Sequence, residues 1–162
     1  MFKNFSLTAI IATMILLAAC KKDGFNPMTD TKPDIPVTVS NLYGTFVAPT
    51  VASNTTDSII KITLSIPATS GRTIKEITRV ASATSYKSVQ VTTGLYNTAP
   101  IPGSGTSVTF TSTLREYINK TGKTVPAPNT ASSFLSTYFF FLVTLDDGST
   151  IIPTYVKVYV TK

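Results

Sequence analysis

Two tyrosines and a lysine near the end of the sequence are the residues best suited to contact a ligand. Tyr155, Lys157 and Tyr159 occupy every second position, and such positions share one face of a β-strand. Tyrosines four apart on a strand lie about 13 Å apart. Their rings can stack on sugars or anchor a protein surface. We expect Tyr138 and Phe140 of an earlier strand to lie on the same outer face.

The alternative for this aromatic face is that the N-terminal segment, a helix or an edge loop covers it. The absence of tryptophan from the sequence counts against a strong carbohydrate platform. Both interpretations remain open at this point, and they differ in whether Tyr155 and Tyr159 lie exposed in a groove.

Groups that perform catalysis are scarce. There is no histidine, which removes the commonest general base, imidazole metal ligands and the Ser-His-Asp triad. Five carboxylates fall in residues 37–162, namely Asp57, Glu76, Glu116, Asp146 and Asp147. Two of them belong to a predicted turn and one to a predicted helix start. We therefore predict no catalytic residues, no metal site and no enzymatic activity.

The first 19 residues have the pattern of a secretory signal. Lys3 precedes an apolar run over residues 5–19. At about 15 residues the run is shorter than the roughly 20 that a transmembrane helix needs, and it fits the apolar region of a signal peptide. The run ends at Cys20, which is the only cysteine of the chain, so no disulfide can form within it.

The motif Leu17-Ala18-Ala19-Cys20 resembles the lipobox of bacterial lipoproteins. The resemblance implies cleavage before Cys20, a diacylglyceryl group on its sulfur and acylation of the new amino terminus. This covalent lipid is the only cofactor we expect, and the membrane is the first partner. The residues after Cys20 are similar to those of lipoproteins from Bacteroidota, which implies a place in the cell envelope, on the outer membrane and exposed at the cell surface.

Residues 20–36 carry three prolines, a glycine and mixed charges without apolar periodicity. This composition predicts a flexible tether between the lipid and a folded domain. The formal net charge of the whole chain is +6, but the positive residues are scattered along the sequence. We therefore expect a soluble surface with a modest positive excess and no nucleic-acid partner.

Residues 37–162 are rich in Thr, Ser, Val, Ile and Tyr, which favour strands. In residues 58–66 isoleucine and leucine alternate with polar residues, the pattern of a half-buried strand. Near the end, Val156, Val158 and Val160 are expected to face the core, with Ile152 before them. Seven strands are predicted, over residues 42–47, 58–66, 73–81, 86–92, 107–111, 135–145 and 151–161.

Turn and cap signals connect these strands. Asp146-Asp147-Gly148-Ser149 supplies the positive φ angles of a tight hairpin turn. A helix over residues 114–121 is predicted by a capping box of Thr113 and Glu116, with Gly122 as its C-terminal cap. Leu114, Tyr117 and Ile118 are expected to share its apolar face.

Together these signals predict an all-β fold, an antiparallel β-sandwich of about seven strands with one short crossover helix. The strand spacing resembles that of immunoglobulin-like and fibronectin-type domains on bacterial surface lipoproteins, which implies one immunoglobulin-like domain over residues 37–162. We expect a non-enzymatic accessory binding or assembly module whose partner is a surface glycan or an envelope protein. The alternative is a structural envelope protein that makes protein–protein contacts through its outer sheet.

Overall fold

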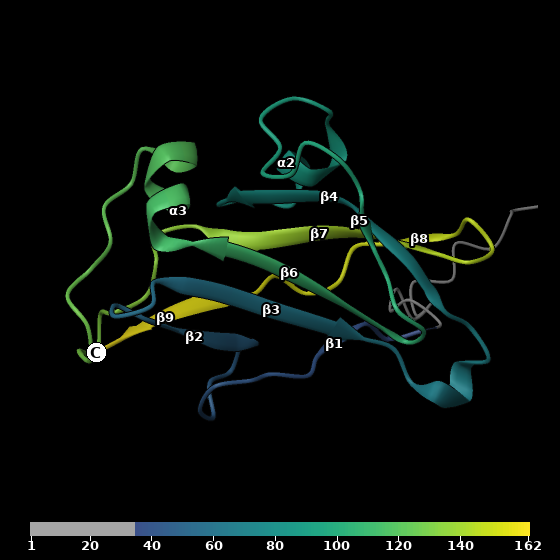
Figure 1. The fold of residues 1–162 in the computed structure, drawn as a ribbon, viewed down its shortest axis with the longest axis horizontal. Coiled ribbons are helices and arrows are strands. Elements are labelled where there is room, and N and C mark those ends of the chain that lie inside the picture. The colour runs from purple at the N-terminus through teal and green to yellow at the C-terminus, as the bar shows by residue number, and fades with distance from the viewer. Residues whose placement is uncertain (1–34) are drawn as a thin grey trace, which may run out of the picture. The chain divides into compact units, whose positions relative to one another are not determined.

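The computed structural model describes residues 35–162, which form an all-β sandwich of mostly antiparallel strands in two layers (Figure 1). The predicted fold class is confirmed. One layer contains β1 (Thr38–Val39), β3 (Ile59–Ser65) and β6 (Ser107–Thr113) in that order. The other contains β5 (Ile101–Pro102), β4 (Ile74–Ala83), β7 (Tyr138–Leu145) and β8 (Thr150–Ile151), and it is continued by the pair β9 (Lys157–Thr161) and β2 (Thr50–Asn54).

The last strand, β9, is held along both edges. On one side it pairs in parallel with β2, from Thr50 opposite Lys157 onward. On the other side the chain leading into β7 runs antiparallel to it, since Leu135 N–H donates to Val158 O at 3.0 Å and isolated bridges join Phe139 to Val156 and Phe134 to Tyr159. The predicted final hairpin therefore exists, but it is interrupted after Ile151.

The core lies between the two layers and follows the alternation read from the sequence. Ile60, Ile62 and Leu64 of β3 are completely buried. The Phe110 ring of β6 lies 5.6 Å from Phe139 and 5.8 Å from Phe141 across the sandwich, measured between ring centroids. Because each ring removes a large apolar surface from water, these contacts between layers hold the sheets face to face.

The predicted crossover helix is α3 (Leu114–Thr121), which follows directly from β6 (Figure 1). Thr113 Oγ1 accepts a hydrogen bond from Glu116 N–H, and Gly122 ends the helix in the left-handed conformation at φ 67°. Ile118, which was predicted to face inward, is 43% exposed. The buried side of the helix is narrower than predicted because Leu114 and Tyr117 alone fill it.

Two predicted strands are wrong. Residues 42–47 form a loop between β1 and β2, in which Gly44 turns the chain with φ +68° and Leu42 and Val47 point to solvent. Residues 86–92 contain a one-turn helix, α2 (Lys87–Gln90), in place of a strand. A second short helical turn, η1 (Ala68–Ser70), precedes β4. No helix within residues 35–162 is long and apolar enough to cross a membrane.

Candidate functional site

The candidate site is the outer face of β7 and of the chain that follows its hairpin. Figure 1 shows α2 above β4, on the side of the sheet turned away from the other layer. Val89 of α2 is fully buried there, against Ala81 and Phe140. Phe140 was predicted to lie on this outer face, and it does, but only 5% of it is exposed because α2 covers it. Phe140 is therefore a buried contact of the site and not an exposed ring.

Tyr138 and Tyr155 form a stacked pair beside Phe140. Their ring centroids are 4.6 Å apart and their planes differ by 24°, while Phe140 lies 6.0 Å from Tyr155 in a tilted contact. Both tyrosines are partly buried, so each residue stays partly accessible to solvent. The pair is a small aromatic platform whose orientation is fixed by ring stacking.

Lys157 connects this pair to a second aromatic group. Its Nζ lies 5.5 Å from the centroid of the Tyr138 ring and 5.3 Å from that of Phe134. An ammonium over an aromatic face is attracted by the partial negative charge that the ring's quadrupole places on that face. Lys157 therefore stabilises the orientation of both rings and is not a freely mobile cation at the surface.

Tyr159 belongs to the second group and not to the platform. Its ring stacks on Tyr43 at 5.6 Å between centroids and contacts Phe134 and Phe46. Its hydroxyl donates to the carbonyl of Thr130 at 3.0 Å. The loop over residues 42–47 thus covers Tyr159, and the five residues predicted to act together divide into an open part around Tyr155 and a covered part around Tyr159.

An open hollow of about 430 Å³ lies next to the Tyr155 ring. Tyr155 and Phe140 contribute to it from the predicted site. The remaining lining residues come from α2 and its N-terminal flank and from the segment between β8 and β9: Tyr86, Gln90, Ile152, Pro153 and Thr154. These five were not predicted as site residues because both segments were assigned to strands. The prediction that Ile152 faces the core is wrong, since Ile152 is only partly buried and packs in the outer cluster with Phe140.

Pro153 explains why the hollow forms at this point. Proline has no N–H to donate to a neighbouring strand, and it occurs in sheets only at edges and irregularities. The pairing of β8 with β7 stops at Ile151 and resumes at Val156. The residues between them leave the sheet, and their displacement opens the space between this segment and α2. A proline inside a predicted strand was the signal that could have located the hollow.

The carboxylates of the domain have structural roles elsewhere. Arg72 forms ion pairs with Asp146 at 3.0 Å and with Asp147, joining the start of β4 to the hairpin turn. Within residues 35–162 no group of three His, Cys, Asp or Glu side chains is placed to hold a metal ion. Glu116 Oε2 accepts a hydrogen bond from Ser112 Oγ at 2.8 Å.

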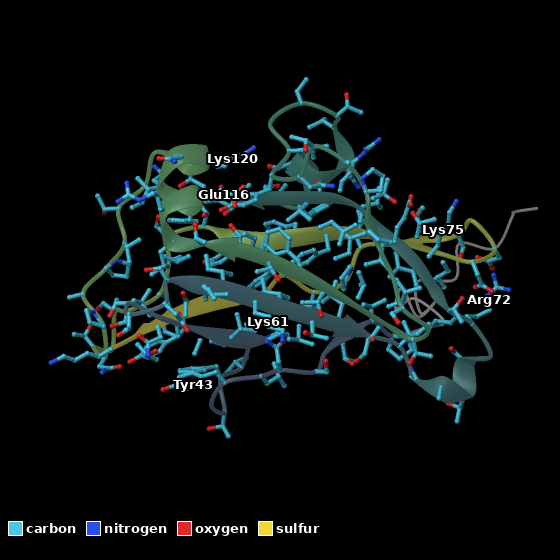
Figure 2. All side chains as sticks on the ribbon, viewed as in Figure 1. Tyr43, Lys61, Arg72, Lys75, Glu116 and Lys120 are labelled. Carbon is cyan, nitrogen blue, oxygen red and sulfur yellow. The ribbon has the colours of Figure 1, made fainter. Side chains whose placement is uncertain are left out.

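That bond belongs to a network beside α3, in which the Tyr96 hydroxyl lies 3.0 Å from Ser112 Oγ. Burial raises the pKa of Tyr96 to about 12, so the phenol stays neutral at any physiological pH. Figure 2 shows Glu116 and Lys120 on α3, and the Lys120 ammonium lies 5.9 Å from the Tyr96 ring. These contacts hold the helix on the sandwich. None of the described residues that line the hollow is a carboxylate.

Cys20, the predicted lipid attachment site, lies outside the described residues. No family model matches the chain, and no curated protein or solved structure matches it either.

Proposed function

We propose that the protein is a lipid-anchored lipoprotein of the bacterial cell envelope, and that its sandwich is a non-enzymatic accessory module which binds a partner through the outer face of the last hairpin. The anchor is Cys20, after the motif Leu17-Ala18-Ala19, and its covalent lipid is the only cofactor. The module acts at the outer membrane, with a surface glycan or an envelope protein as its partner.

The observation that carries the binding role is the Tyr138–Tyr155 platform at the edge of an open hollow. The two rings are stacked at 4.6 Å and remain partly accessible, and Tyr155 lines the hollow. An aromatic ring held in one orientation loses little conformational entropy when a partner packs on it, and tyrosine is therefore frequent at binding surfaces.

A structural role in the envelope is the second candidate, and the loop over residues 42–47 favours it. Leu42 is 59% exposed and Val47 is completely exposed, beside the partly exposed rings of Tyr43 and Phe46. Contiguous exposed apolar side chains mark protein interaction surfaces. In this alternative the loop makes the contact, and the hairpin face serves the fold only.

Two measurements test the proposal. Membrane fractionation of cells that express the wild type or Cys20→Ala tests the anchor, and the variant should leave the membrane fraction or accumulate as uncleaved precursor. Pulldown from envelope extract and binding to a glycan array, compared between Tyr155→Ala and Tyr43→Ala, tests the surface. We expect loss of the partner in Tyr155→Ala alone. Loss in Tyr43→Ala alone would assign the contact to the loop and support the second candidate.

A further inference from the structure

The hollow beside Tyr155 has a lining suited to one class of ligand. Its walls are aromatic at Tyr86, Tyr155 and Phe140 and aliphatic at Ile152 and Pro153, and it carries two polar side chains, Gln90 and Thr154. None of the described lining residues is charged. We infer that this hollow binds a neutral carbohydrate, the end or a side branch of an uncharged glycan.

The platform for a sugar ring is already oriented. Tyr138 stacks on one face of Tyr155 and does not line the hollow, so the part of the Tyr155 ring that reaches the hollow is one that Tyr138 does not cover. The Lys157 ammonium lies over the Tyr138 ring and helps to hold Tyr138 in the orientation that stacks on Tyr155. The face of an aromatic ring is negative, and it therefore attracts the C–H bonds on the flat side of a pyranose.

Polar side chains at the rim match the other surface of a sugar. A sugar hydroxyl both donates and accepts a hydrogen bond, and the Gln90 amide and Thr154 hydroxyl can also do both. Both side chains are exposed, so they are available to a ligand. Arg79 Nη1 donates to the main-chain carbonyl of Gln90 at 2.7 Å, which holds the C-terminal end of α2 on β4 and leaves the Gln90 side-chain amide at the rim.

The same lining disfavours other ligands. An anionic ligand needs a cation close to it. No cation is among the described residues that line the hollow, and the Arg79 guanidinium near its rim already donates to the main-chain carbonyl of Gln90. A purely apolar chain would cover the Gln90 amide and the Thr154 hydroxyl without giving them hydrogen-bond partners, which costs free energy. A volume of about 430 Å³ in an open hollow suits one or two sugar rings bound from the surface.

This inference rests on the proposed binding role of the hairpin face. Its test uses the lipidated full chain, purified in a detergent without a sugar headgroup. The probes are neutral oligosaccharides of glucose, mannose, galactose and xylose, and the comparison set is oligogalacturonate and heparin fragments. Saturation-transfer NMR identifies binders, and calorimetry measures their affinity. We expect at least one neutral oligosaccharide to bind while the anionic ones do not.

Three variants and a control locate the site. Tyr155→Ala should weaken the affinity for the neutral oligosaccharide by roughly thirtyfold, the effect of losing a hot-spot residue. Tyr86→Ala and Gln90→Leu, which change exposed side chains, should each weaken it severalfold. Tyr43→Ala is the matched control, because Tyr43 packs on Tyr159 at the other end of the outer face, away from α2 (Figures 1 and 2), and does not line the hollow. The affinity of this variant should equal that of the wild type.

The inference is overturned if no neutral oligosaccharide binds, if the anionic ones bind equally well, or if affinity is unchanged in Tyr155→Ala. Should Tyr155→Ala fail to fold, unchanged affinity in both Tyr86→Ala and Gln90→Leu overturns it as well. Capture of an envelope protein that is lost in Tyr155→Ala, without any sugar bound, refutes the carbohydrate site but supports the proposed function. Binding that depends on Tyr43 and not on Tyr155 refutes both.

Discussion

Two neighbouring substitutions on β9 test how the domain is held together. Val158 is completely buried. It faces Val51 of β2 in the parallel register, and its carbonyl accepts a hydrogen bond from Leu135 N–H on the other side. Lys157, one position earlier, points to the outer face and contacts solvent. Val158→Ala and Lys157→Ala therefore probe opposite faces of the same strand.

The expected losses of stability differ by about twofold or more. Val158→Ala removes two buried carbon atoms, and each methylene removed from a core costs about 0.5–1.5 kcal/mol, so the free energy of unfolding should fall by about 2 kcal/mol. Lys157→Ala removes the contacts of its ammonium with the Phe134 and Tyr138 rings. Such contacts contribute about 0.5–1 kcal/mol at exposed sites, and the loss should stay within this range.

Urea denaturation followed by tyrosine fluorescence measures both values. With an m value of about 1.5 kcal/mol/M, the midpoint should fall by about 1.3 M in Val158→Ala and by less than about 0.7 M in Lys157→Ala. The m value should not change, since neither variant alters the surface exposed on unfolding. Equal shifts in the two variants would mean that both faces of β9 are buried and that the aromatic platform is part of the core.

Three further outcomes are expected. Mass spectrometry of the mature protein should find a diacylglyceryl group on Cys20, and an unmodified Cys20 would contradict the anchor. Because the pKa of Tyr96 is raised to about 12, its neutral form stabilises the fold in full below about pH 10, and this stability is lost as the pH rises towards 12. Urea titrations of Tyr96→Phe should therefore show a smaller fall in the free energy of unfolding between about pH 10 and 12. Gly103→Ala should cost about 1–3 kcal/mol, because a Cβ there overlaps the Ile74 carbonyl oxygen, whereas Ser104→Ala should melt like the wild type.

The elements that were predicted correctly are those whose signal lies in residues close together in the sequence. The alternation of apolar and polar residues around Ile62 identified β3 and its buried face, because a strand with one face towards the core and one towards solvent needs that pattern. The Asp146–Ser149 turn and the Thr113 cap were recognised because each depends on residues within four positions of one another. The parallel pairing of β2 with β9 was not predicted, because nothing in either segment encodes a partner so far away in the sequence.

The candidate site was only partly predictable for the same reason. Tyr138 and Tyr155 lie on the outer face, as the period of two implies. Their separation from Tyr159, however, depends on where the loop over residues 42–47 folds back, and apolar residues in that loop resemble a strand when only composition is considered. Tyr86 and Gln90 reach the hollow through α2, a helix of a single turn that is too short to show a helical period.

The position of β9 between β2 and the chain before β7 has a consequence for the order in which the molecule assembles. Asn54 Nδ2 donates to the Lys162 carbonyl, 108 positions later in the sequence, so β2 has no parallel neighbour until more than a hundred further residues have emerged. Pairings of such long range form slowly, because the loop between them must close first. A chain synthesised from its N-terminus therefore cannot complete this layer early, and we expect the layer to close only after β9 has been synthesised.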